Sequence, residues 1–170
     1  EINLRFYVKR VEGDIVKRGV VFINETVPYK PVAWLANKLY KEHYTAIPTK
    51  NKIELNQHSK HINYQWKINK NWNHLDVQTA VESEPMKPDS IEEFIFEHYY
   101  GYTKINKHAT QEYKVNHPRW LINKVNDCSI NCDFEAMYGT DFAHLSNKQP
   151  DSVIMAEGSA VTVNWKRTSF

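Results

Sequence analysis

EINLRFYV (residues 1–8) alternates polar and apolar side chains without a break. Side chains of a β-strand point to opposite faces in turn, so this pattern predicts a strand over residues 1–10 with one apolar face. The other face carries a carboxylate, an amide, a guanidinium and a phenol, from Glu1, Asn3, Arg5 and Tyr7. If enclosed, these groups suit a polar ligand, because a buried guanidinium needs a counter-charge. The alternative is a solvent-exposed face of an edge strand.

Further short elements follow from this strand. Residues 19–24 are apolar on both faces, which predicts a central strand. Pro31 opens a helix with a one-sided apolar stripe, and the S-x-x-E capping box at residues 90–93 opens a second helix that reaches about Glu97. The remaining expected strands cover residues 44–47, 52–57, 62–68, 75–82, 110–117, 120–125, 130–137 and a final hairpin, 152–157 with 159–166, around Gly158.

Two short helices among about nine strands predict an α+β fold, with a β-rich curved sheet or a β-barrel. The length of 170 residues fits a single domain, 1–170. The chain begins inside the first expected strand, so we expect that an upstream N-terminal segment is lacking.

Composition argues against several classes of function. The net charge is only +2, and the arginines are scattered rather than gathered in a basic stripe, so we expect no nucleic-acid partner. The longest apolar runs, such as Val20 to Ile23, are too short to span a membrane, and no signal peptide is visible, so we expect a cytoplasmic protein. Cys128 and Cys132 read as two reduced thiols rather than a disulfide or zinc pair.

Motifs for the common catalytic classes are missing. The sequence has no G-x-S-x-G, P-loop, G-x-G-x-x-G or H-E-x-x-H motif, so we expect no cofactor. His58, His61 and His74 are a weak signal for a metal without Cys or Asp partners nearby, and we expect no metal site.

Two further segments concentrate chemistry-bearing side chains. His117 precedes Pro118 at the end of an expected strand and can place its imidazole in a cavity, or simply pack there. The segment from Glu97 to Tyr102 holds a carboxylate, His98 and three tyrosines. The structural alternative for this segment is an aromatic anchor between helix and sheet, with His98 favourable at the helix C-terminus.

The ordered segments EINLRFYV, GVVFINETVP, ANKLYKEHYTAIP, FIFEHYYGYT and EYKVNHPRW resemble the YqjF-like family of bacterial proteins of unknown function. That family is similar, distantly, to acetoacetate decarboxylase. The resemblance implies a conical β-barrel of the acetoacetate-decarboxylase-like type with a central cavity, and Glu1 is similar to a pocket carboxylate of the decarboxylase. It therefore implies that the polar face of the first strand points inward.

The same resemblance implies that the inherited reaction is lost. The decarboxylase forms a Schiff base through one of two adjacent lysines in this region, but Tyr44 and Thr45 stand at the matching positions here. A phenol cannot form an imine, and Lys38 and Lys41 read as solvated residues of the helix. Acetoacetate-type decarboxylation is therefore not expected.

We expect an internal cavity that binds a small organic anion, with Arg5 as the counter-charge. The expected ligand-binding residues are Glu1, Asn3, Arg5, Tyr44, Tyr100 and His117. One alternative is a lysine-independent enzyme for a keto-acid-like or enol-like substrate, with His117 or Glu1 as general base and Tyr44 as donor to an oxyanion. Another is a structural or assembly protein that forms a homo-oligomer through its aromatic residues.

Overall fold

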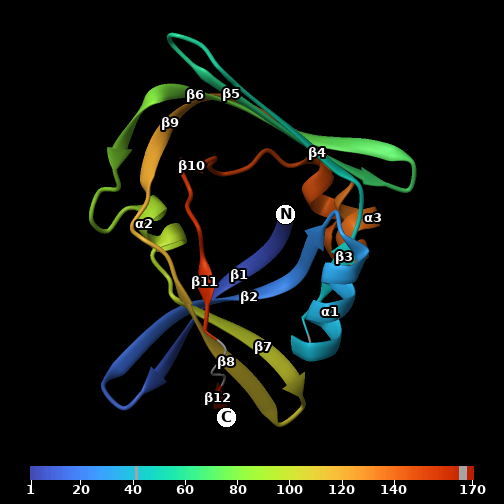
Figure 1. The fold of residues 1–170 in the computed structure, drawn as a ribbon, viewed down its shortest axis with the longest axis vertical. Coiled ribbons are helices and arrows are strands. Elements are labelled where there is room, and N and C mark those ends of the chain that lie inside the picture. The colour runs from blue at the N-terminus through green and yellow to red at the C-terminus, as the bar shows by residue number, and fades with distance from the viewer. Residues whose placement is uncertain (41, 165–167) are drawn as a thin grey trace. The chain divides into compact units, whose positions relative to one another are not determined.

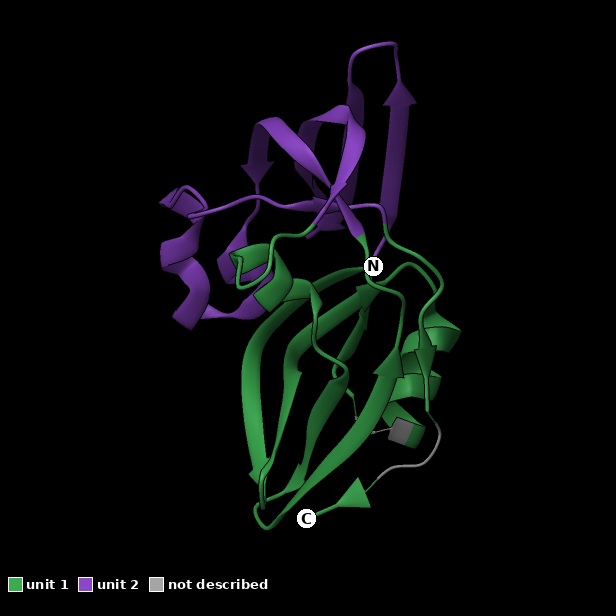
Figure 2. Ribbon diagram, turned by 90° about the vertical axis from the view of Figure 1, so that its left-hand side faces the viewer, with its two compact units in different colours: residues 1–46, 86–120, 158–170 green, residues 47–85, 121–157 purple. Residues whose placement is uncertain are grey.

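The computed structural model describes residues 1–40, 42–164 and 168–170 (Figure 1). The chain divides into two compact units, each assembled from separate stretches (Figure 2). Unit 1 comprises residues 1–46, 86–120 and 158–170, and unit 2 comprises residues 47–85 and 121–157. The α+β class is confirmed, because the described residues form two sheets and a few short helices. The single domain stays a prediction.

Unit 1 contains a sheet in the order β1-β2-β7-β8-β11, with β3 paired to β2 and β12 paired to β8. Its strands are β1 (Ile2–Glu12), β2 (Ile15–Val27), β3 (Tyr44–Ala46), β7 (Tyr100–Asn106), β8 (Ala109–Asn116), β11 (Thr162–Val163) and β12 (Thr168–Ser169). The predicted first strand and the predicted central strand are both confirmed: β2 lies between β1 and β7. A tight turn at Gly13, whose φ is +60°, joins β1 to β2.

Two glycines allow aromatic rings to cross the sheet of unit 1. A Cβ on Gly101 would overlap the ring of the buried Tyr113, and a Cβ on Gly19 would lie 2.6 Å from Cε2 of Tyr102. Both tyrosine rings therefore occupy the space that side chains at these positions would need.

The buried carboxylate Glu112 ties the β1–β2 hairpin to β8. Arg10 and Lys17 form ion pairs with it at 2.9 and 2.8 Å, and Lys17 also reaches Glu12 at 2.7 Å. Burial raises the pKa of Glu112, but the hydrogen bonds from Lys17 and Arg10 outweigh burial and leave it below its usual range.

Two helices belong to unit 1, α1 (Lys30–Tyr40) and α2 (Ile91–Phe96). The predicted cap of α2 is present, since Ser90 Oγ accepts a hydrogen bond from the Glu93 N–H at 3.2 Å. Ala33 of α1 is buried, whereas Leu35 and Leu39 of the predicted apolar stripe stay about half exposed.

Unit 2 contains a sheet in the order β10-β9-β6-β5-β4. Its elements are β4 (Thr49–Leu55), β5 (Lys60–Ile68), β6 (Asn71–Pro85), β9 (Leu121–Asn131), α3 (Phe134–Tyr138), a 3₁₀-helix (Thr140–Asn147) and β10 (Met155–Ala156). Ile62, Trp66 and Val77 are buried in this unit. The Asn123 side chain donates to the carbonyls of residues 80–82, where β6 loses its register with β9. It thereby satisfies backbone groups that the irregular pairing leaves open.

Several sequence-based expectations about elements were wrong. Residues 130–137 are not one strand: Asp133 caps α3 by accepting from the Ala136 N–H at 2.9 Å. The expected final hairpin does not form, because β10 pairs with β9 and β11 pairs with β8; residues 165–167 of that expectation lie outside the described residues. Strand β7 was not expected, and α3 adds a third helix to the predicted two. Among the described strands, the pairing closes neither sheet into a barrel.

Candidate functional site

Unit 1 contains a hollow of about 380 Å³, called here the main hollow. All six residues expected to bind a ligand line it: Glu1, Asn3, Arg5, Tyr44, Tyr100 and His117. Its apolar wall includes Val20, Phe22, Ile95, Val115, Trp120 and Val163. The structure therefore brings together every predicted position, from β1, β3, β7 and the end of β8, while the binding of a ligand stays a prediction.

A β-bulge decides which side chains of β2 reach the main hollow. Asn3 pairs with Glu25 and Arg5 pairs with Phe22, so the register shifts between Leu4 and Arg5. In a regular strand, residues 22 and 25 would point to opposite faces. The extra residue in β2 puts Phe22 and Glu25 on the same face of the sheet as their partners Arg5 and Asn3.

Glu25 is the main addition to the predicted site. It is only 5% exposed, and its Oε1 accepts a hydrogen bond from the Tyr44 hydroxyl at 2.9 Å. Its Oε2 is buried without a hydrogen-bond partner among the described residues. Burial, with additional repulsion from Glu42 and Glu1, raises the pKa of Glu25 to about 8, despite the hydrogen bond from Tyr44. At neutral pH this side chain is therefore mostly a neutral carboxylic acid.

Tyr44 is held between carboxyl groups by the parallel pairing of β3 with β2, which places it beside Glu25. Its hydroxyl also lies 3.5 Å from Oε1 of Glu1. Burial and then the neighbouring Glu25 raise the pKa of Tyr44 well above its usual range, so it stays a phenol. Tyr44 therefore serves as a hydrogen-bond donor and cannot serve as a base.

Arg5 is the cation of the main hollow. It forms no ion pair among the residues that the structure describes; its guanidinium contacts the Tyr7 hydroxyl at 3.4 Å and lies 5.6 Å from the Tyr7 ring centroid. Next to it, His98 is 9% exposed, and burial followed by the Arg5 charge lowers the pKa of His98 to about 4. His98 is therefore neutral, and the positive charge of Arg5 is left uncompensated.

His117 lies in a stack of aromatic rings. Its ring centroid is 4.9 Å from that of Tyr99 and 4.3 Å from that of Trp120, with nearly parallel planes. Trp120 is itself fixed, because its indole N–H donates to Ser159 Oγ at 2.8 Å. The Nδ1 of His117 lies 2.9 Å from the Pro118 carbonyl oxygen. The stack fixes the imidazole at the wall of the hollow.

Sequence reasoning missed Glu25, and it weighed His98 only as part of a cluster. A regular alternation along β2 would put Phe22 and Glu25 on opposite faces. The sequence does not reveal the bulge that brings them to the same face. No lysine lines the main hollow in the described part of the chain.

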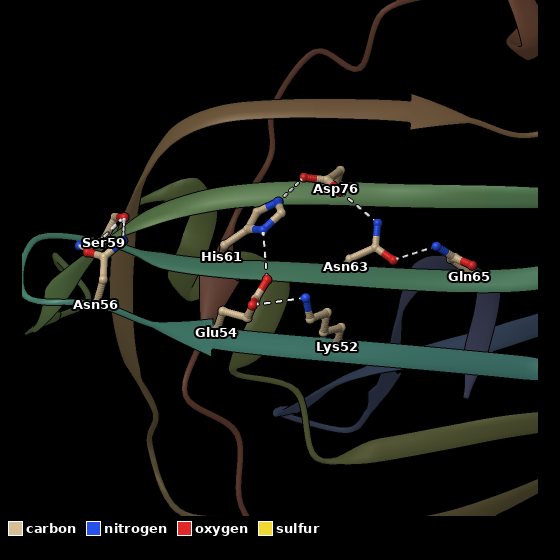
Figure 3. A network of polar contacts seen from close by, with 8 residues as sticks. All are labelled: Lys52, Glu54, Asn56, Ser59, His61, Asn63, Gln65 and Asp76. Carbon is tan, nitrogen blue, oxygen red and sulfur yellow. Dashed lines mark hydrogen bonds and ion pairs between the residues drawn. The ribbon is translucent and has the colours of Figure 1, made fainter.

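A polar network covers one face of β4, β5 and β6 in unit 2 (Figure 3). His61 bridges Asp76 through Nε2 and Glu54 through Nδ1, the latter at 3.9 Å. Asn63 extends the network by donating to Asp76 at 2.6 Å and accepting from Gln65 at 2.8 Å. These groups satisfy one another, so the network stabilises pairs across the strands and leaves no evident group for a ligand.

No group of three or more His, Cys, Asp or Glu side chains within the described ranges is arranged to hold a metal ion. Cys128 and Cys132 are free thiols. Each helix that the structure describes is too short or too polar to cross a lipid bilayer.

A family model described as DUF2071, uncharacterized conserved protein, matches residues 1–160. No curated protein and no solved structure matches the chain significantly. The expectation of an uncharacterised family is thus confirmed, while the YqjF-like name and the relation to acetoacetate decarboxylase stay predictions.

Proposed function

Because the chain belongs to the DUF2071 family of uncharacterised conserved proteins, we propose a function from the site itself: the main hollow binds a small organic anion. Arg5 carries this proposal, because its guanidinium lines the hollow and has no ion-pair partner among the described residues. A partly buried cation without a counter-charge favours an anionic ligand, and guanidinium matches the planar fork of a carboxylate.

The groups around Arg5 favour the same ligand class. Glu25, with its pKa raised to about 8 by burial, does not repel an anion at neutral pH and can donate its own proton in a hydrogen bond. His98 is neutral and so adds no second positive charge next to Arg5. The exposed carboxylate Glu1 lies on the Tyr44 side, which directs the negative end of a ligand towards Arg5.

The size and the wall of the main hollow favour an organic ligand rather than an inorganic ion. A volume of about 380 Å³ lies at the small end of ligand pockets. Val20, Phe22 and Trp120 offer an apolar surface to a hydrocarbon or aromatic part. The relation to acetoacetate decarboxylase, supported by the order of the shared segments, and the cytoplasmic location, supported by two free thiols, remain parts of this proposal.

Benzoate and benzamide form a matched pair of probes, since they differ in charge and hardly in shape. Backbone NMR spectra of the full chain at pH 7 are expected to show saturable shifts of β1 and β2 amides with benzoate and much weaker shifts with benzamide. Raising the pH to 9 should weaken benzoate binding, because Glu25 then ionises. Equal responses to the two probes would contradict the proposal.

Glu25 also gives the enzymatic alternative a specific form. A buried acid with its pKa near 8, in the same hollow as the unpaired guanidinium of Arg5, can act as a general acid on a keto-acid-like or enol-like substrate. The acid-base role thus moves from Glu1 or His117 to Glu25. Turnover of a panel of keto acids, lactones and enols by the full chain, abolished by Glu25→Gln, would support it; no turnover over the whole panel would refute it.

The assembly alternative rests on helix α1, where Trp34 is 60% exposed and Leu39 is 58% exposed. Exposed apolar side chains of this size are typical of protein contacts. A monomeric sedimentation profile at high concentration would count against a homo-oligomer.

A further inference from the structure

A second hollow of about 410 Å³ lies further along the β1–β2 hairpin in unit 1. It is lined by Tyr7, Val8, Lys9, Arg18, Gly19, Phe94 and His98. Tyr7 and Lys9 follow Arg5 on the same face of β1. The Tyr7 ring contacts the His98 ring, with the ring centroids 5.0 Å apart. His98 lines both hollows, and Tyr7 lines the second.

The charges of the second hollow are unusual. Lys9 is paired directly with Arg18 across β1 and β2. Two like charges at opposed positions of a β-ladder, with side chains roughly 5 Å apart at Cβ, repel and destabilise the pairing. Neither side chain forms an ion pair among the described residues. Arg18 lies near enough to Glu93 to influence its pKa, but that carboxylate is bound by Arg119 at 2.5 Å and by the Asp89 N–H at 2.7 Å.

The next pair along the same hairpin provides an internal comparison. Arg10 and Lys17 are also like-charged and directly opposed. Those two, however, are neutralised by Glu112 and by Glu12. The hairpin therefore supplies carboxylates for one cationic pair and leaves the other, Lys9 and Arg18, exposed at an open hollow. Both charges are free there to form charge-assisted hydrogen bonds with an anion.

Aromatic side chains form the rest of this hollow. Phe94 is 45% exposed, and its ring centroid lies 5.3 Å from that of Tyr7 in an edge-to-face contact. An exposed phenylalanine beside two cations offers apolar contact to a ring and charge to an anionic group at the same place.

We propose that the second hollow binds an aryl phosphate, with the phosphate between Lys9 and Arg18 and the aromatic ring against Phe94 and Tyr7. Two cations on neighbouring strands match the double negative charge of a phosphate monoester better than the single charge of a carboxylate, and both side chains are common phosphate ligands. This site does not depend on the anion proposed for the main hollow.

Phenyl phosphate is the probe, titrated into the full chain by calorimetry at low salt, with inorganic phosphate and phenol as its two halves. Saturable binding is expected for phenyl phosphate, tighter than for either half. Lys9→Gln and Arg18→Gln should each weaken it about tenfold, since each removes one charge-assisted contact. Phe94→Ala should weaken phenyl phosphate and leave inorganic phosphate unchanged.

Lys104→Gln is the control, and it is expected to bind phenyl phosphate as the unchanged chain does. Arg5→Gln removes the cation of the main hollow and should retain the phenyl phosphate binding that depends on Lys9 and Arg18. Lys104 is an exposed cation of β7 outside both hollows. Loss of phenyl phosphate binding in Arg5→Gln but not in Arg18→Gln would overturn the proposal by assigning the ligand to the main hollow. Equal affinity for inorganic and phenyl phosphate, or no saturable binding, would overturn it as well.

Discussion

Replacing Glu25 with glutamine keeps the shape of the side chain and the acceptor for the Tyr44 hydroxyl while removing the ionisable proton. Burial holds the pKa of Glu25 near 8 in the folded chain, against an ordinary value of 4.5. Between these two pH values the folded chain keeps a proton that the unfolded chain has lost. The stability contributed by protonated Glu25 is therefore full below pH 4.5 and is lost as the pH rises through 8.

The size of the effect follows from the same two pKa values. Each pH unit between 4.5 and about 8 corresponds to about 1.4 kcal/mol, so the free energy of unfolding should fall by up to about 5 kcal/mol over this range. Local opening that hydrates the carboxylate reduces this upper limit. The Glu25→Gln variant lacks the titration, and its stability should decline far less.

Urea denaturation of the full chain at pH 5, 7 and 9, followed by circular dichroism, measures the difference between the variant and the unchanged chain. Glu25→Gln is expected to gain stability relative to the unchanged chain as the pH rises, and to be the more stable of the two at pH 9. Glu135→Gln, at an exposed position of α3, is the matched control and should show a constant difference.

A difference between Glu25→Gln and the unchanged chain that stays constant within about 0.5 kcal/mol from pH 5 to pH 9 would refute the reasoning. In that case Glu25 would be an ordinary carboxylate in the folded chain. The hydrogen-bond role assigned to its proton in the main hollow would then fail too.

Other consequences of the structure can be tested in the same chain. Gly101→Ala should destabilise unit 1 by about 1–3 kcal/mol in urea denaturation, because its Cβ meets the ring of buried Tyr113; unchanged stability would mean that the ring moves freely. Glu112→Gln should cost about 1–3 kcal/mol, because Arg10 and Lys17 lose their buried counter-charge and keep only the exposed Glu12; the loss should shrink as the pH falls, and a loss independent of pH would contradict this cause. Iodoacetamide at pH 8, read by mass spectrometry, should label Cys128 well before Cys132, because burial raises the pKa of Cys132 to about 11; equal rates would contradict that burial.

The sequence predicted the polar face of the first strand because a period of two is a direct consequence of strand geometry. It could not predict Glu25, because a single extra residue in β2 reverses which side chains share a face. The bulge depends on the pairing of β1 with β2, and no local signal in residues 15–27 marks it.

Longer-range pairing explains the other errors. The last segment reads as a hairpin around Gly158, but β10 finds its partner in β9 and β11 finds its partner in β8. The paired residues lie 32 to 48 positions apart in the sequence, beyond what a local pattern can indicate. The error at α3 was avoidable, since Asp133 and Gly139 are ordinary signals for the two ends of a short helix.

The affinity of benzoate for the unchanged chain, Arg5→Gln and Lys104→Gln, measured by calorimetry at pH 7, tests most directly whether the main hollow binds a small organic anion through Arg5. Arg5→Gln is expected to weaken benzoate binding about tenfold, which is ~1.4 kcal/mol, while Lys104→Gln leaves it unchanged. Equal affinities in all three chains would contradict the role assigned to Arg5 and, with it, the proposed function.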